Sequence, residues 1–191
     1  MRDIRDIIFH ALEGKRFRAV LTAERAGVLS GVDSVRIRAE ELGIALELCK
    51  EEGEELSHGE RIGTLVAGPK QIALAEEQLI GELAKASGIA TAARTAVLLA
   101  DGRARIVSGS WKKMPPQIKE LVRRAVLTGG AAVRIAEPPM IYLDKNYIRM
   151  LGSIQEALRA CAVFSDATTV VQLRGEDGTV AQETRAAVLG G

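Results

Sequence analysis

The sequence has few aromatic side chains. Only six of its 191 residues are Phe, Trp or Tyr, whereas 47% are apolar and 27% are charged. A chain of this length and composition can bury a sizeable core, which must be built from Ala, Val, Ile and Leu. Surfaces on which unpaired bases could stack are scarce. The composition therefore indicates a globular protein and argues against a nucleic-acid partner.

Cysteine and histidine are also scarce. The two cysteines, Cys49 and Cys161, lie far apart without a CxxC pair, and His10 and His58 are the only imidazoles. This set lacks the ligand spacing of a structural zinc site. We therefore expect no metal held by protein ligands. We expect both cysteines to be reduced, buried thiols, and we assign no role to either histidine.

Long unbroken apolar runs are missing. The first ten residues mix charged and apolar side chains at helical spacing, unlike a signal peptide. No stretch approaches the ~20 consecutive apolar residues of a membrane span. The sequence thus predicts a cytoplasmic protein with no membrane partner.

The formal net charge of +1 hides an uneven distribution of charged residues. Residues 40–61 contain eight Glu against two basic residues, whereas residues 101–135 contain eight Lys or Arg against two acidic ones. Cations gathered beside glycines suit a small anionic ligand, a phosphate or a carboxylate, better than a nucleic-acid duplex. The alternative, a solvated helix face with a few basic residues, stays open.

The first hundred residues mix helical and strand patterns. Apolar spacing predicts helices at residues 1–13 and 34–42, and strands at residues 17–22, 44–48 and 61–66. From Pro69 a long periodic stretch predicts a helix over residues 71–99, interrupted by Gly81 and Gly88. At these glycines either the helix bends or another segment packs close to its backbone. The pattern predicts an α+β domain over residues 1–101.

Residues 102–191 alternate between the two kinds of element. The predicted strands are 104–107, 131–135, 140–143 and 168–173, and the predicted helices are 117–127, 154–161 and 181–189. Such alternation indicates a largely parallel sheet with crossover helices. Ligands bind such sheets at the carboxyl ends of the strands, which directs attention to residues 108–113 and 144–146.

Three segments, taken in order along the chain, are similar to motifs of one enzyme family. They are Glu76-Glu-Gln-Leu-Ile-Gly81 with Ser87-Gly-Ile-Ala-Thr91; Arg105-Ile-Val-Ser-Gly-Ser-Trp-Lys-Lys-Met-Pro-Pro-Gln-Ile-Lys119 with Ala125-Val-Leu-Thr-Gly-Gly130; and Tyr142-Leu-Asp-Lys-Asn-Tyr-Ile148 with Gly152-Ser-Ile-Gln-Glu-Ala157. In this order they resemble stretches of the nicotinate-nucleotide pyrophosphorylases, the quinolinate phosphoribosyltransferases of NAD biosynthesis. The resemblance covers roughly residues 20–190.

The resemblance implies a fold of the α/β class, an N-terminal α+β sandwich domain followed by a truncated, open parallel α/β barrel. It also implies a homodimer or larger oligomer whose sites borrow residues from the partner subunit. The family joins a pyridine dicarboxylate to phosphoribosyl pyrophosphate, with loss of carbon dioxide and pyrophosphate. Mg²⁺ is therefore expected only if phosphoribosyl pyrophosphate is used.

The same resemblance assigns candidate site residues but no catalytic residue. Five cations are implied to bind the anionic ligand: Lys112, Lys113, Lys119, Arg134 and Lys145. Seven further residues are candidates for the pocket: Glu77, Ser87, Gly88, Thr91, Trp111, Asp144 and Asn146. For Ser87 and Thr91 the alternative is a helix kink or cap, for Trp111 a core plug, and for Asp144 with Lys145 a surface pair.

Several positions depart from the family pattern. Glu77 stands where the family has an arginine implied to pair with a substrate carboxylate, so it would repel that group. Trp111 and Met114 replace threonines, and Ile135 replaces an arginine. The order of acid and base is reversed at Asp144-Lys145. These changes argue against quinolinate as the ligand.

The similarity ends about where half of the family's barrel has been made, so an apolar sheet edge needs cover from a partner subunit or a rearranged C-terminal part. Two hypotheses stay open. One is an active phosphoribosyltransferase with an altered acceptor, in which the cations neutralise developing charge. The other is a non-catalytic binding or assembly protein on the same scaffold. A different chemistry on the same frame is a third, smaller alternative.

Overall fold

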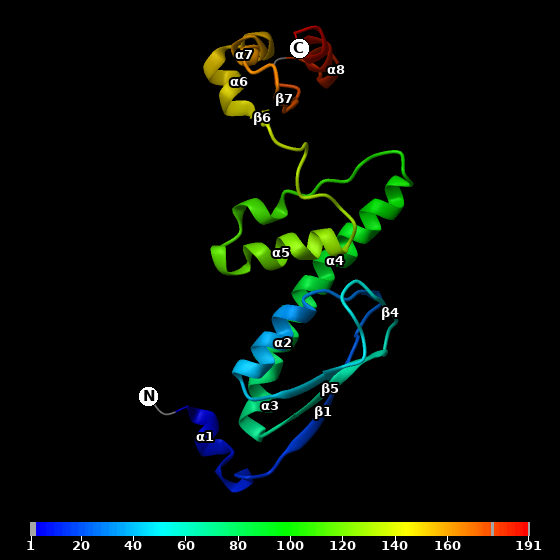
Figure 1. Ribbon diagram of the computed structural model, residues 1–191, viewed down its shortest axis with the longest axis vertical. Helices are drawn as coiled ribbons and strands as arrows, with labels where there is room; N and C mark the ends of the chain where they lie inside the picture. Colours follow the sequence, from blue (N-terminus) through cyan, green and yellow to red (C-terminus); the bar gives the residue numbers. More distant parts are fainter. Residues whose placement is uncertain (1–2, 177, 191) are drawn as a thin grey trace. The chain divides into compact units, whose positions relative to one another are not determined.

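The computed structural model describes residues 3–176 and 178–190. The chain forms two compact units, residues 1–133 and residues 134–191. In Figure 1 the first unit runs from blue to green and the second from yellow to red.

The first unit is built on an antiparallel sheet of strands β1 (Phe17–Thr22), β5 (Arg61–Ala67) and β3 (Ala45–Leu48), with β5 in the centre. These strands match the predicted ones to within a residue at each end. A second ladder pairs β2 (Gly27–Val28) with β4 (Glu55–Leu56), two strands too short to show a sequence pattern. The sheet, helix α2 (Val32–Glu41) and the long helix described next enclose the main core.

One continuous helix runs from Pro69 to Ala100 and crosses the first unit. It consists of α3 (Pro69–Ala75), a π-helical turn (Glu76–Ile80) and α4 (Gly81–Ala100). The predicted long helix is confirmed, but its irregularity lies in the π turn just before Gly81 and not at Gly88. An added Cβ would meet no atom within 4 Å at either glycine, so the expectation of close packing at Gly88 is wrong.

This helix is also long and apolar enough, by length and composition alone, to cross a membrane, and it is one such helix among the residues described. That finding corrects the expectation that no segment approaches a membrane span. The helix contributes Leu79, Leu83, Ala86 and Ala90 to the buried interior. Helices that pack in the cores of globular proteins pass the same test.

Helix α5 (Pro116–Thr128) packs across α4, and a 3₁₀ turn (Ser110–Lys113) precedes it. The crossing is close because Gly129 follows the helix: a Cβ there would lie 2.5 Å from the Cβ of Ala93. The predicted strands at residues 104–107 and 131–135 are wrong, since only an isolated parallel bridge, Val107 to Ala132, forms. No third strand among the described residues flanks these two segments, and a lone pair of short segments is marginally stable.

The second unit contains a parallel pair, β6 (Met140–Leu143) and β7 (Thr168–Val171), with Met140 opposite Thr168. Helices α6 (Lys145–Leu151) and α7 (Ile154–Cys161) connect the strands, and α8 (Val180–Gly190) follows β7. Sequence patterns predicted β6 and α7 correctly but missed α6. The small core gathers Leu143, Ile148, Ile154, Ala157 and Leu158.

The N-terminal segment and the cysteines also differ from expectation. The predicted helix at residues 1–13 is divided into α1 (Ile4–Ile8) and a 3₁₀ turn (His10–Leu12). Both cysteines are free, as expected, but Cys49 is exposed and Cys161 only partly buried. Cys49 follows strand β3, where its sulfur lies 3.2 Å from the carbonyl oxygen of Ile62.

Candidate functional site

The expected site residues fall in both units. Trp111 and three of the cations belong to the first unit, whereas Arg134, Lys145, Asp144 and Asn146 belong to the second.

Trp111 organises a cationic cluster in the first unit. The Lys119 ammonium lies 5.5 Å from the centroid of its ring, and the Arg123 guanidinium carbon lies 5.6 Å from it. Both distances fit cation–π attraction. Trp111 also packs against the apolar cluster of Ala93 and Val126 between α4 and α5, so it fills the core while it holds two cations.

The cluster includes buried donors that have no acceptor. Among the described residues, the Nε1 atom of Trp111 and the Nε atom of Arg123 have no hydrogen-bond partner, and neither does the Nε atom of Arg94 on α4. A buried N–H group without a partner costs free energy unless a water or ligand accepts from it. Arg123 was not among the residues expected from the sequence, and its spacing alone carried no signal.

Lys112 and Lys113 extend the cluster towards solvent. Both are exposed on the 3₁₀ turn that precedes Pro116, the first residue of α5. The N-terminal end of a helix carries partial positive charge from its free N–H groups. The turn therefore presents two ammonium groups beside a helix end that also favours anions.

Glu77 does not act alone in the structure. It lies on the π turn, and its carboxylate accepts a hydrogen bond from the guanidinium of Arg5 on α1. This bond raises the pKa of Arg5 above its ordinary value, and the nearby Asp3 acts in the same direction. The negative charge that replaces the family's arginine is thus paired with a cation from the N-terminal segment, which weakens the expected repulsion.

Ser87 and Thr91 bind the chain's own backbone. The Ser87 hydroxyl accepts from the amide of Ser30 at 3.0 Å, and the Thr91 hydroxyl accepts from the amide of Val28 at 2.9 Å. Thr91 also donates to the Ser87 carbonyl at 2.7 Å. These hydroxyls fasten the segment that contains β2 to α4. A Cβ at Gly27 would lie 2.5 Å from the Thr91 hydroxyl oxygen, so glycine permits this approach.

In the second unit the residues at the strand ends have local roles. Asp144 caps α6 and accepts from the amides of Asn146 at 2.8 Å and Tyr147 at 3.2 Å. Asp144 is thus a helix cap, and no ion pair with Lys145 forms. The amide of Lys145 donates to Gln172 of the neighbouring chain segment at 3.1 Å. On the surface, the Nη1 atom of Arg134 lies 3.8 Å from the Oε2 atom of Glu137.

A second charged cluster follows strand β7, and the sequence analysis missed it. Glu176 accepts from Arg174 at 2.6 Å and from Arg149 at 2.7 Å, and these bonds hold its pKa below the ordinary value. The buried carboxylate of Glu183 accepts from the amides of residues 174–176 at 2.8, 2.9 and 2.8 Å. Gly175 in this loop has φ +71°, a conformation that glycine adopts readily. A glycine can indicate a turn in the sequence, but it does not indicate that Glu183 binds the amides of that turn.

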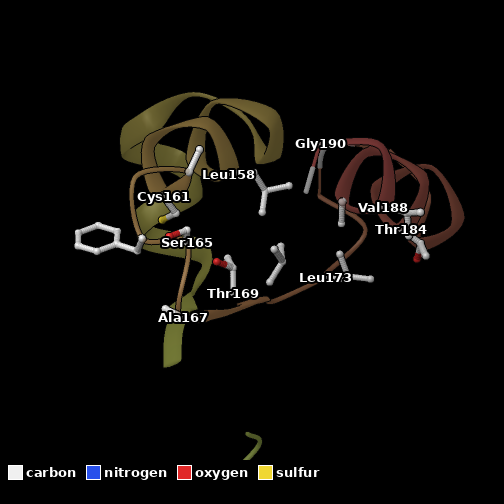
Figure 2. A pocket seen from close by; sticks show the side chains of 13 residues that line it. Leu158, Cys161, Ser165, Ala167, Thr169, Leu173, Thr184, Val188 and Gly190 are labelled. Carbon is white, nitrogen blue, oxygen red and sulfur yellow. The ribbon is translucent and has the colours of Figure 1, made fainter. Parts of the chain in front are cut away.

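The second unit also contains an apolar pocket of about 560 Å³ between α7, α8 and β7. Figure 2 shows Leu158, Cys161, Thr169 and Leu173 around it. Its lining includes no ionisable acid or base other than the Cys161 thiol. The pocket therefore does not suit an anionic ligand.

Among the described residues, no group of three or more His, Cys, Asp or Glu side chains is arranged so that it could hold a metal ion.

Comparisons with known proteins agree with the fold and the motifs. Residues 6–87 match the model of the quinolinate phosphoribosyl transferase N-terminal domain, and residues 89–188 match that of its C-terminal domain. The probable carboxylating nicotinate-nucleotide pyrophosphorylase of Methanothermobacter thermautotrophicus is 30% identical over 162 residues, 81% of this chain and 57% of that protein. Its counterpart from Archaeoglobus fulgidus is 29% identical over 184 residues, 94% of this chain and 69% of that protein.

Solved structures give the same result. The nicotinate-nucleotide pyrophosphorylase of Francisella tularensis superposes with a TM-score of 0.75 at 22% identity, covering 97% of this chain and 65% of that one. That of Pyrococcus furiosus gives 0.73 at 22% identity and covers 97% and 51%. The predicted α/β fold class is confirmed. The chain spans just over half the length of the Methanothermobacter relative, and it belongs to the quinolinate phosphoribosyltransferase family.

Proposed function

We propose that the protein is a phosphoribosyltransferase-type scaffold that binds a small anionic ligand, a phosphate or a carboxylate, in the cytoplasm. The observation that carries the proposal is the cluster of Lys112, Lys113, Lys119 and Arg123 around Trp111 at the start of α5. Arg134 and Lys145 of the second unit are further candidates for binding the anionic ligand.

The residues of the cluster have separable roles. Trp111 fixes Lys119 and Arg123 through its ring, which lowers the entropy lost when an anion is bound. Lys112 and Lys113 supply exposed positive charge near the N-terminal end of α5. If phosphoribosyl pyrophosphate is the ligand, these cations neutralise its phosphates, and Mg²⁺ enters with the ligand.

We infer that quinolinate is not the ligand. Its two carboxylates call for arginine forks, and this chain offers Glu77, Trp111, Met114 and Ile135 at four of the corresponding positions. Losing one buried charge-assisted contact costs about 2–5 kcal/mol. Incubation with quinolinate, phosphoribosyl pyrophosphate and Mg²⁺ should give negligible nicotinate mononucleotide, and robust formation would contradict the inference.

A non-catalytic binding or assembly role is the second candidate. The acids near the strand ends of the second unit serve the fold: Asp144 caps α6, and Glu183 holds the loop after β7. They are therefore already occupied by backbone N–H groups. A calorimetric titration of phosphoribosyl pyrophosphate with Mg²⁺ separates the two candidates. Tight Mg²⁺-dependent binding favours an active phosphoribosyltransferase, and no binding favours the non-catalytic role.

A homodimer or larger oligomer is also proposed. The support is apolar surface on described residues, including Ile4, Ile7 and Ile8 on α1 and Val188 and Leu189 on α8. Exposed apolar groups of this size favour association. Light scattering at micromolar concentration should give more than the 20.4 kDa of one chain. A folded sample with the mass of one chain would refute the proposal.

A further inference from the structure

A cavity of about 470 Å³ lies within the first unit, and none of its lining residues belongs to the Trp111 cluster. Its walls come from the ends of β1, β2 and β5 on one side and from the π turn and α4 on the other. Its lining includes five buried apolar side chains, Leu21, Val28, Leu56, Ile62 and Leu83, beside exposed apolar ones such as Val20 and Ile80. Its volume falls in the range of about 300–1,000 Å³ that holds small ligands.

Small residues of α4 keep the cavity open on the helix side. Ala84 and Gly88 line it, and an added Cβ at Gly88 would meet no atom within 4 Å. Ser87 and Thr91 also line it, but their hydroxyls already bond to the backbone of residues 28 and 30. The interior therefore offers apolar surface and little hydrogen-bonding capacity.

The mouth of the cavity carries one cation. Arg25 is the only Lys or Arg among the described residues that line the cavity, it is exposed, and its guanidinium has no hydrogen bond or ion pair with any described residue. The loop that bears it is anchored, because His58 Nδ1 donates to the carbonyl oxygen of Glu24 at 2.6 Å. The Glu24 carboxylate at the same mouth does not pair with Arg25, so the guanidinium fork stays free for a ligand.

We propose that this cavity binds a small amphipathic carboxylate, an aromatic or aliphatic body inside the cavity with its carboxylate on Arg25. A planar guanidinium pairs with a carboxylate through two parallel hydrogen bonds and is weakly hydrated, which suits the edge of an apolar site. The cavity is lined by Ser87, Gly88 and Thr91, which the resemblance makes candidates for the family's pocket, but it shares no lining residue with the cationic cluster at Lys112–Lys119. Its ligand can therefore be tested separately, and the proposal stands if the cluster binds no anion.

Two glycines of α4 provide a matched test of the cavity. Gly88→Leu places a side chain in the cavity, whereas Gly81→Leu adds the same side chain to the same helix outside it, and neither Cβ meets another atom. Both changes favour the helix equally. With 2-naphthoate as the probe in a calorimetric titration, Gly88→Leu should weaken binding at least about tenfold, the effect of losing ~1.4 kcal/mol, and Gly81→Leu should leave it unchanged.

The role of the Arg25 charge is tested with the variant Arg25→Gln. The control is Arg18→Gln, which removes an exposed cation of β1 that does not line the cavity. Arg25→Gln should weaken 2-naphthoate about five- to tenfold but leave the neutral 2-naphthamide unchanged, because an exposed charge-assisted contact is worth ~1 kcal/mol. Inorganic pyrophosphate should not compete. The proposal is overturned by no binding to the unaltered chain, by equal loss in both leucine variants, or by tighter binding of 2-naphthylammonium than of 2-naphthoate.

Discussion

The two units of the chain differ in how much core supports them. Among the described residues, the main core of residues 1–133 gathers fourteen buried apolar side chains between a three-stranded sheet and two helices. The core of residues 134–191 gathers five against a two-stranded parallel sheet. Parallel strands are stable when both faces are covered by neighbours. The first unit therefore has a core large enough to stabilise its own fold, whereas we expect the second unit to have a small free energy of unfolding.

The largest expected effect tests this difference directly. Leu143→Ala removes a side chain that is 1% exposed from the small core, and such a truncation costs about 2–5 kcal/mol. We expect residues 134–191 to lose protection from amide exchange while residues 1–133 keep theirs. Leu79→Ala, at a fully buried position of the larger core, is the matched control and should leave its unit folded. Loss of protection in both units after Leu143→Ala would contradict the comparison.

A second pair of substitutions tests the packing within the first unit. Gly129→Ala places a methyl group 2.5 Å from the Cβ of Ala93 and should cost about 1–3 kcal/mol of the free energy of unfolding. Gly88→Ala meets no neighbour and should gain ~1 kcal/mol from helix propensity. Urea denaturation of both variants measures whether each change lowers or raises the free energy of unfolding. Equal effects would show that α4 and α5 are not held at this crossing.

Each unit also contains a carboxylate that fastens separate segments. Glu183 is buried and accepts three amides, so Glu183→Ala should cost the second unit about 1–3 kcal/mol. Glu52 is exposed and accepts from Ser30, Gly31, Val32 and Thr128. Because water can replace an exposed acceptor, Glu52→Ala should cost less. Chemical denaturation followed separately in each unit ranks them, and a larger loss for Glu52 would reverse the order.

The smallest effect concerns pH. Hydrogen bonds from Arg174 and then Arg149 hold the pKa of Glu176 below its ordinary 4.5 in the second unit, and those from Lys50 and the Ser57 amide do so for Glu60 in the first. A lowered folded pKa stabilises above the ordinary pKa, and this stability is lost as the pH falls through the folded pKa. Glu176→Gln should flatten the acid limb of unfolding in the second unit. Salt should weaken the effect, because Glu176 and its two arginine partners are exposed. An unchanged acid limb would argue against these pairs.

Most elements of the fold could be predicted because their signals are local. Alternation gave β1 its boundaries, and Pro69 with the apolar period gave the long helix its start. The strands predicted at residues 104–107 and 131–135 could not be corrected from sequence, because a strand needs neighbours that local patterns do not reveal. The π turn likewise replaced a bend expected at glycine.

The candidate site was less predictable because its contacts are long-range. The sequence identified Trp111, Lys112 and Lys119 through one segment, but the cation–π pair with Arg123 depends on how α5 lies on the 3₁₀ turn. The pairing of Glu77 with Arg5 joins residues 72 positions apart. A charge that looked repulsive in the sequence is thus compensated by a segment outside the motif.

The proposed function requires that the cationic cluster at residues 112–119 binds a small anion. The most direct measurement is a calorimetric titration of inorganic pyrophosphate into the unaltered chain and into Lys112→Gln/Lys113→Gln. The control, Lys85→Gln/Arg103→Gln, removes the same charge from exposed positions elsewhere in the first unit. We predict binding that weakens about tenfold or more in the first variant and stays within about twofold in the control, since losing two charge-assisted contacts costs at least ~1.4 kcal/mol. Equal weakening in both variants, or no binding to the unaltered chain, would contradict the account.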